Sequence, residues 1–274
     1  MKAHKATILS NLKIPEEQCY PHGHANMAHS EIAVAIVRHN AMIELDKFGE
    51  LLCSRAIDDR ERKVFFATMW AFLKYVPSGI INLAAKMTDE HIESQTWEAS
   101  AQAAYILYAS IEEYGLQHYR TRMLTTHHQM FKKLITHFGI TDEDIFNKTY
   151  IKPIGTKMGK NVYKYYRSDK LGEALGFHLA SEMMSSRAFH YFLKGFQKHP
   201  REYNLIHAND PILDFFKVHC EIDPMHVETG RNMLVSYIAK NNNVTNDTME
   251  GALAYMGCIE QMFKMMNIEL AGRH

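Results

Sequence analysis

Two histidines and an aspartate stand close together in the stretch "FFKVHCEIDPMHVET", residues 215–229. On a helix that turns about 100° per residue, His219, Asp223 and His226 project from one narrow stripe. Mixed nitrogen and oxygen donors of this kind suit iron, manganese or zinc. A second interpretation stays open, because an aspartate directly before Pro224 is also a good helix N-cap.

A second segment, "YASIEEYGLQHYRTRMLTTHHQMF", also combines acidic residues with histidines. Glu113 and His127 are fourteen residues apart, which is about 21 Å on an unbroken helix. One metal ion could bind both only if the helix breaks, and Gly115 is the expected place for the break. His118 and His128 compete with His127 for the role of ligand. Without a break, these side chains form a solvated helix face.

The third segment is "GEALGFHLASEMMSSRAFHYF", in which Glu182 lies within an apolar run. A carboxylate that faces a core is unfavourable unless it is paired or bound to a metal. Alternatively, Glu182 lies on a polar face beside Arg187. His178, one helical turn before Glu182, is a candidate partner for the carboxylate.

The elements that must position these residues are helices. Segments of 3.6-residue periodicity recur along the chain, and no alternating strand pattern persists. We expect one all-α bundle of about eight helices, with residues 1–274 forming a single domain. The expected helices are Ser30–Leu52, Asp59–Tyr75, Glu90–Tyr114, His118–Phe138, Gly172–Lys198, Pro211–Ile222, Pro224–Asn241 and Thr245–Met266. "VPSG" is expected to end the second helix, and "GITDED" and "KPIGTKMGKN" to form the main loops.

Composition excludes several classes of partner. Lysine and arginine together number 31, as do aspartate and glutamate, so nothing predicts an electrostatic grip on nucleic acid or anionic lipid. The four cysteines have no paired spacing, which is typical of a reduced, cytoplasmic chain. No signal peptide and no apolar run of membrane-spanning length is evident. We therefore expect a cytoplasmic protein that binds neither nucleic acid nor membrane.

Three helical segments that each combine acidic residues with histidines are what a dinuclear carboxylate site in a helical bundle requires. A ferritin-type site is excluded, because no glutamate is followed by histidine three residues later. The chain instead resembles the heme-oxygenase-like di-iron oxidases over residues 98–229. The resemblance lies in "EEYG" followed by "HHQMF", in "HLASEMMSSR", and in the His-x-x-x-Asp-x-x-His pattern of "HCEIDPMHVE". The interval from Glu113 to His127 is longer than in typical members by about one turn.

The resemblance implies a heme-oxygenase-like bundle that holds two iron ions and uses O2 as co-substrate. The implied iron ligands are Glu113, His127, Glu182, His219, Asp223 and His226. Many members use a further glutamate from an earlier helix, for which Glu90, Glu93 and Glu98 are the candidates.

The same resemblance suggests a small-molecule substrate. An amino acid or its derivative is favoured over a fatty acid, with N-oxygenation, desaturation or C–C cleavage as the reaction. Tyr114, His178 and Arg187 are the candidates for substrate binding, and each is equally suited to a structural role. An external electron donor is compatible with this activity, and a homodimer is left open.

Three other functions compete with this one. A thiaminase-like hydrolase needs a cysteine nucleophile in the pocket, but Cys220 points away from the stripe of His219 and Asp223. A heme oxygenase needs one proximal histidine near the N-terminus, such as His39, and leaves the acidic residues unexplained. A non-catalytic helical metal-binding or interaction protein is the third alternative.

Overall fold

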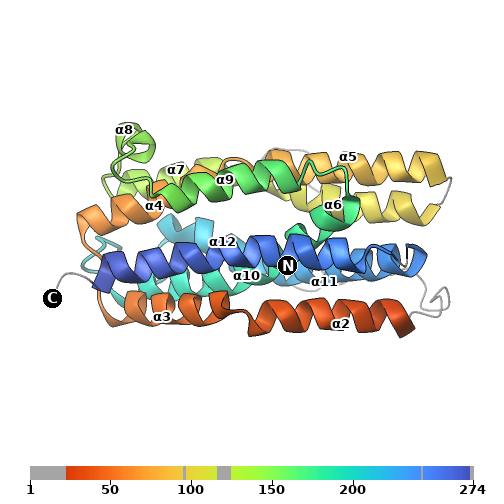
Figure 1. Ribbon diagram of the computed structural model, residues 1–274. Coiled ribbons are helices and arrows are strands. Elements are labelled where there is room, and N and C mark those ends of the chain that lie inside the picture. Colours follow the sequence, from red (N-terminus) through yellow and green to blue (C-terminus); the bar gives the residue numbers. More distant parts are fainter. Residues whose placement is uncertain (1–22, 95–96, 116–124, 242, 272–274) are drawn as a thin grey trace.

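Helices account for all of the regular structure that is described. The structure, a computed structural model, describes residues 23–94, 97–115, 125–241 and 243–271 (Figure 1). Within these ranges there are eleven α-helices, one short 3-10 helix and no strand. The helices are α2 (Gly23–Arg38), α3 (Asn40–Ser54), α4 (Asp59–Leu73), α5 (Val76–Ser94), α6 (Trp97–Glu113), α7 (His127–His137), α8 (Asp142–Phe146), α9 (Pro153–Tyr165), α10 (Leu171–Lys198), η2 (Pro211–Leu213), α11 (Asp214–Lys240) and α12 (Thr245–Ala271). The all-α prediction is confirmed, with more and shorter helices than the eight expected.

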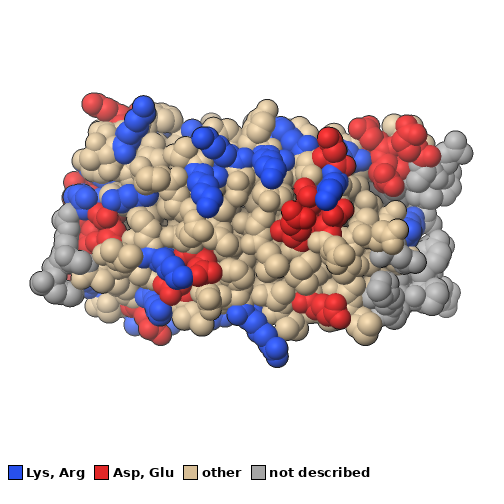
Figure 2. All heavy atoms as spheres, in the orientation of Figure 1, with Lys and Arg blue, Asp and Glu red and all other residues tan. Residues whose placement is uncertain are grey.

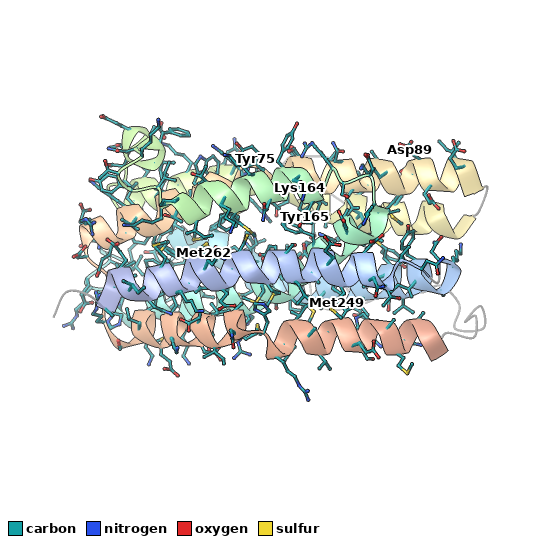
Figure 3. All side chains as sticks on the ribbon, viewed as in Figure 1. Tyr75, Asp89, Lys164, Tyr165, Met249 and Met262 are labelled. Carbon is teal, nitrogen blue, oxygen red and sulfur yellow. The ribbon has the colours of Figure 1, made fainter. Side chains whose placement is uncertain are left out.

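Helix α10 lies at the centre of an elongated bundle, and most of the long helices run roughly side by side (Figure 1). It packs against α11, α12 and α3, while α5 pairs with α6 and α4 pairs with α9. Aromatic and aliphatic side chains fill the space between the helices (Figure 3). The largest fully buried ones include Phe48, Phe65, Phe66, Phe131, Tyr166, Phe177, Phe196, Phe216 and Phe263. This core positions α6, α10 and α11, the helices that carry five of the six implied iron ligands.

Glycines bring α10 and α12 into backbone contact. A Cβ atom at Gly176 would lie 1.9 Å from the Thr248 carbonyl oxygen, and one at Gly251 would lie 2.0 Å from the Glu173 carbonyl oxygen. Only a residue without a side chain permits this approach. The contact fixes the start of α10, the helix that bears Glu182.

The segment "KPIGTKMGKN" is helical, so its prediction as a loop is wrong. It forms most of α9, with Pro153 in the first turn, where a missing N–H is harmless. Gly155 and Gly159 face α4, and a Cβ atom there would lie 2.7 Å and 2.5 Å from the carbonyl oxygens of Thr68 and Ala71. These glycines serve close helix packing rather than chain flexibility. "GITDED" likewise contains a helix, α8, which Thr141 caps.

Three other predicted boundaries are corrected. The helix predicted over Ser30–Leu52 is divided into α2 and α3 at His39, whose Nδ1 atom accepts a hydrogen bond from the Ala41 N–H. The helix predicted over Asp59–Tyr75 does end before "VPSG", at Leu73, but "VPSG" then begins α5, with Pro77 in the first turn. The helix predicted over Glu90–Tyr114 is accordingly two helices, α5 and α6.

Helix α11 is continuous through Pro224, although the sequence predicts two helices that meet there. Proline removes the N–H that would bond to the Cys220 carbonyl, and this weakens a helix without necessarily ending it. Asp223 consequently lies in the helix interior and is not an N-cap. The capping interpretation of the 215–229 stretch is therefore wrong.

The face of the molecule shown in Figure 2 carries cationic and anionic side chains interspersed. One helical stretch among the described residues, Asp59–Glu90, is long and apolar enough to cross a bilayer. It comprises α4 and α5, and 61% of its most apolar window is buried inside the bundle. Core helices of soluble proteins have the same property, so the stretch is weak support for a membrane span.

Candidate metal site

Two trios of ligand-type residues meet inside the bundle. The first cluster is Glu113, His127 and His219, and the second cluster is Glu182, Asp223 and His226. Within each trio, potential ligand atoms lie within 4.8 Å of one another. The six residues are those that the resemblance implies as iron ligands.

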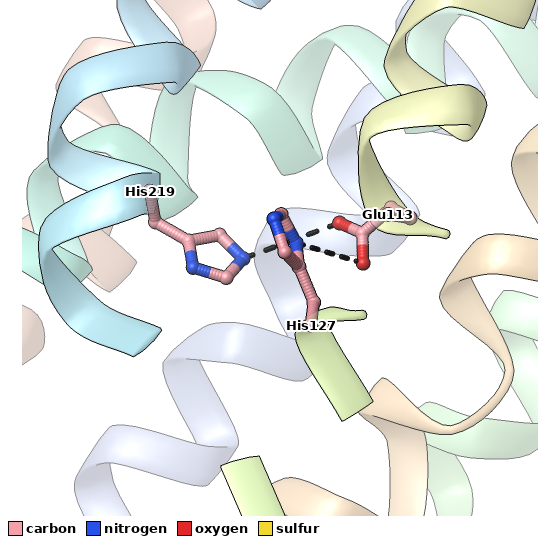
Figure 4. A group of neighbouring side chains, drawn as sticks. All are labelled: Glu113, His127 and His219. Atoms are coloured by element: carbon pink, nitrogen blue, oxygen red, sulfur yellow. Dashed lines mark ion pairs between the residues drawn. The ribbon is translucent and has the colours of Figure 1, made fainter. Parts of the chain in front are cut away.

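The first cluster joins three helices (Figure 4). Glu113 is the last residue of α6 and His127 the first of α7, while Gly115 between them has a φ of 77°. His127 Nδ1 lies 3.0 Å from Glu113 Oε2, without the alignment of a hydrogen bond. His219 Nε2, on α11, lies 4.0 Å from Glu113 Oε1. Helix α6 thus ends at Glu113 and α7 begins at His127. Because the two residues are not on one continuous helix, their side chains can meet.

His219 is held in the tautomer that a ligand requires. Its Nδ1 atom lies 2.7 Å from the Phe215 carbonyl oxygen, to which it donates, and this leaves Nε2 free to accept. The Phe189 ring stacks on the imidazole at a centroid distance of 3.9 Å. Burial, with His127 nearby, lowers the pKa of His219 to about 4. At neutral pH the ring is therefore uncharged and able to coordinate.

Glu113 is ionised despite its location. Burial alone would raise its pKa, but His127, followed by His219 and His226, holds the pKa at about 2. A carboxylate that is charged in the interior needs compensation by cations or donors. His127, at 3.0 Å, is the histidine nearest to this carboxylate.

The second cluster is centred on His226. Its Nδ1 atom lies 3.4 Å from Glu182 Oε2, and its Nε2 atom donates to Glu112 Oε2 at 3.0 Å. Burial lowers the pKa of His226, but the hydrogen bonds to Glu112 and Glu182 outweigh this effect and raise it to about 10. In the metal-free protein the imidazolium thus lies between two carboxylates.

Asp223 is the least compensated group in the site. It is 3% exposed, and its Oδ2 atom has no hydrogen-bond partner. Burial, reinforced by Glu182, raises the pKa of Asp223 well above its usual range. A buried carboxylate oxygen without a donor is the environment that a cation would stabilise.

Glu112 is a further carboxylate at this site, and no sequence pattern singled it out. It is buried, and it accepts hydrogen bonds from His226 and from the Tyr108 hydroxyl, the latter at 2.9 Å. Its only sequence signal is the adjacent acidic pair at the end of α6. Neighbouring residues on a helix project about 100° apart, so Glu112 and Glu113 reach different clusters.

Glu90 and Glu93, the two candidates for a seventh ligand that lie on α5, are not members of the clusters. The Glu98 side chain lies outside the described part of the chain. His118 also lies outside it. His128 borders the first cluster, but its ring packs against the edge of Trp70 at a centroid distance of 4.9 Å.

The three expected substrate-binding residues have different locations. His178 is buried, with Nδ1 3.0 Å from the Tyr166 hydroxyl and 3.6 Å from Glu182 Oε1. Tyr114 is 42% exposed at the end of α6. Arg187 makes a bidentate ion pair with Asp46 on the surface, at 2.6 and 2.7 Å. Of the three, only His178 lies beside a cluster.

Residues that the competing functions require lie elsewhere. Cys220 does not line the cavity, and burial together with Asp223 raises the pKa of its thiol to about 12, which disfavours a thiolate nucleophile. His39 caps α3 and approaches Glu260 at 3.6 Å. Neither residue belongs to the two clusters.

One cavity connects the clusters. Glu113 and His219 of the first cluster, and all three members of the second, line it together. Its other walls are apolar or hydroxyl-bearing: Phe72, Leu73, Val76, Ile80, Val162, Tyr166, Phe177, Ser181, Ser185, Phe189 and Tyr255. The described lining contains no lysine or arginine to balance the carboxylates.

An all-α bundle that buries carboxylates and histidines around one cavity has the donor set of a non-heme metal protein. The comparison with protein families agrees: residues 65–258 match the family model described as iron-containing redox enzyme. Because the match covers more than half of the chain, this protein belongs to that heme-oxygenase-like family. A search of the curated proteins found no match.

Proposed function

We propose that the protein is an O2-dependent non-heme di-iron oxidoreductase. The observation that carries this proposal is the single cavity whose lining includes members of both clusters. The site has four carboxylates, Glu112, Glu113, Glu182 and Asp223, and two divalent cations would balance their full charge. The unpartnered Oδ2 atom of Asp223 fits the same requirement.

The first cluster would hold one iron through Glu113, His127 and His219, and the second would hold the other through Glu182, Asp223 and His226. Glu112 either joins the second group directly or orients His226. Iron held by these residues would supply electrons for the reduction of O2, which is the chemistry needed to oxidise a substrate. Further electrons come from the substrate or from an external donor.

The chain's own residues have three tasks in this reaction. The Phe215 carbonyl and the Phe189 ring hold His219 in position. Apolar side chains such as Phe72 and Ile80 exclude water from the cavity. Tyr166, which is hydrogen-bonded to His178, keeps that imidazole beside Glu182. We further propose a small-molecule substrate and a cytoplasmic location.

Anaerobic loading with Fe(II), followed by exposure to O2, tests the proposal. We expect close to two irons per chain and O2 consumption that accelerates with a suitable substrate. His219→Ala and His226→Ala should each lose iron, whereas His190→Ala, on the exposed face of α10, should not. Wild-type iron content in both site variants would exclude the di-iron assignment. Two irons with no O2 consumption would favour a non-catalytic metal-binding protein.

A further inference from the structure

The outer face of α9 carries a concentration of positive charge. Residues 145–168 contain five lysines and one arginine but no aspartate or glutamate, although the formal net charge of the chain is zero. Lys157, Lys160 and Lys164 occupy exposed positions of α9 and project within an arc of about 60°. With the C-cap residue of α4 and an arginine that follows α9, they form a cationic surface, whose members are Lys74, Lys157, Lys160, Lys164 and Arg167.

Two tyrosines lie among these cations. Tyr163 is 52% exposed, and the Arg167 guanidinium lies over its ring at 4.0 Å from the centroid. The Tyr75 ring meets Tyr163 edge-on, at a centroid distance of 6.4 Å, and the Lys74 Nζ atom lies 5.1 Å from the Tyr75 centroid. Tyrosine and arginine are enriched at protein–protein interfaces and in the residues that dominate their affinity.

The charge of the cationic surface is not balanced locally. Within the described part of the chain, its members contact uncharged groups: Lys157 donates to the Gln261 side chain, and Arg167 donates to a hydroxyl and a backbone carbonyl. Lys152 and Lys170, near the two ends of α9, instead have carboxylate partners. Figure 2 shows cationic side chains gathered over α9. Such a field attracts an anionic partner and accelerates its association.

The opposite face of α9 lines the cavity between the clusters. Val162 and the C-cap residue Tyr166 belong to that lining, and the Tyr166 hydroxyl reaches His178 beside Glu182. Figure 3 shows Lys164 on the same helix. A helix with its side chains is about 10 Å across, so only one helix separates the cationic surface from the cavity.

We propose that the cationic surface docks an acidic protein that carries single electrons and reduces the iron. The inference rests on the proposed function, in which the iron must regain the electrons that it gives to O2. In each encounter the carrier loses one electron and a ferric ion gains it, so no bond forms or breaks and the carrier leaves oxidised. The unbalanced charge and the single intervening helix both favour this partner.

Two other anionic partners fit the surface less well. A helix that binds a membrane needs apolar side chains on its exposed face, but the apolar residues of α9 are mostly buried against the bundle. Affinity for nucleic acid depends on the number of phosphates that are neutralised, and a patch of five cations in a chain without net charge neutralises few.

Calorimetric titration of the metal-free protein with an oxidised plant-type [2Fe–2S] ferredoxin, an acidic carrier, tests the docking. We expect one ferredoxin per chain, and binding about tenfold weaker at about 0.2 M than at about 0.02 M ionic strength, because salt screens exposed charges. A basic cytochrome c should not bind. Binding that does not weaken with salt, or tighter binding of phosphatidylserine vesicles or single-stranded RNA, would overturn the inference.

Paired substitutions separate the cationic surface from general effects of charge. Lys160→Glu combined with Lys164→Glu should weaken ferredoxin binding by about tenfold or more. Lys194→Glu combined with Lys198→Glu is the matched control, with the same spacing at exposed positions of α10, and should change binding by less than about threefold. Replacing Lys160 and Lys164 by glutamine should have an intermediate effect. Equal binding by all variants would contradict the proposal.

Stopped-flow mixing of reduced ferredoxin with the anaerobic ferric protein tests the electron transfer. The Lys160→Glu/Lys164→Glu protein should be reduced about tenfold more slowly than wild type at limiting ferredoxin, in proportion to its weaker binding. Excess dithionite should reduce the iron of both proteins completely, which shows that the site itself is intact. Equal rates with ferredoxin would overturn the inference.

The outcomes separate this inference from the proposed function. If iron is bound and O2 is consumed but ferredoxin does not distinguish the variants, the inference fails and the proposed function stands. If iron is not bound, the proposed function fails, and titration of the metal-free protein still reports whether the cationic surface docks an acidic carrier.

Discussion

At the scale of single residues, the surroundings of Asp223 differ from those of a structural carboxylate. In the helix interior it caps nothing, and one of its oxygens has no donor. A residue in this state is unfavourable in the metal-free protein, because burial opposes its charge and its Oδ2 atom has no hydrogen-bond partner. The proposed metal site gives this carboxylate a role that the fold alone does not.

We predict that Asp223→Asn lowers iron content while leaving the metal-free protein as stable as wild type, or more stable. The amide keeps the size of the side chain but removes the buried charge and an anionic donor. Iron analysis and thermal unfolding of the metal-free form measure the two effects.

Asp210→Asn is the matched control for this substitution. Asp210 accepts hydrogen bonds from the N–H groups of Ile206 and Ile212, both of which lower its pKa. Its replacement should reduce stability by about 1 kcal/mol and leave iron content unchanged. If Asp223→Asn behaved like Asp210→Asn, Asp223 would be a structural residue.

At the scale of elements, close helix packing sets the position of the ligands. Glu182 lies on α10, and the start of that helix is fixed by backbone contact with α12 at Gly176 and Gly251. A side chain at either glycine must separate the two helices. Glycine disfavours helix formation, but within these helices it permits close packing.

We predict opposite effects for two glycine substitutions on α12. Gly251→Ala should destabilise the protein by about 1–3 kcal/mol, because the new methyl group meets the Glu173 carbonyl. Gly257→Ala should stabilise it by about 0.5–1 kcal/mol, because nothing lies within 4 Å of the added atom and alanine favours helix. Urea unfolding curves compare the two. Equal effects would show that α10 and α12 are less closely packed than described.

At the scale of the whole molecule, the sequence predicts the helical class better than the element boundaries. The spacing of His219, Asp223 and His226 is local and periodic, so one helix determines it. The boundary errors have one physical cause: Gly155, Gly159, Pro77 and Pro224 disfavour helix locally, but tertiary packing or position in the first turn overrides that preference.

Contacts between distant segments were beyond local reasoning. Glu112 meets His226 across 114 residues, and its role follows from the angle between α6 and α11 rather than from any motif. The pairing of Arg187 with Asp46 is equally non-local, over 141 residues. Prediction from a single chain therefore named the six residues that the fold brings into the two clusters and missed some of their partners.

The folded molecule and its metal should be coupled through pH. His226 has a pKa of about 10 in the metal-free protein, so its ion pairs stabilise the fold below the unfolded pKa of about 6.5 and weaken as pH rises through about 10. A metal ion at the second cluster must displace this proton. Metal affinity should therefore rise with pH over the range in which His226 is protonated.

We predict that stabilisation by Mn(II), a redox-inert probe of the site in air-free buffer, increases between about pH 6 and pH 8. For one displaced proton per ion, affinity rises about tenfold per pH unit, which adds about 1.4 kcal/mol of stabilisation per unit at saturating metal. Scanning calorimetry with Mn(II) and with chelator measures the difference.

In Glu112→Gln the pKa of His226 should fall, since one of its two carboxylate partners is gone, and the dependence on pH should become shallower. Glu50→Gln, an exposed position on α3 that belongs to none of the candidate metal groups in the described part of the chain, should retain the wild-type slope. Stabilisation by Mn(II) that does not vary with pH would show that His226 keeps its proton and is not a ligand.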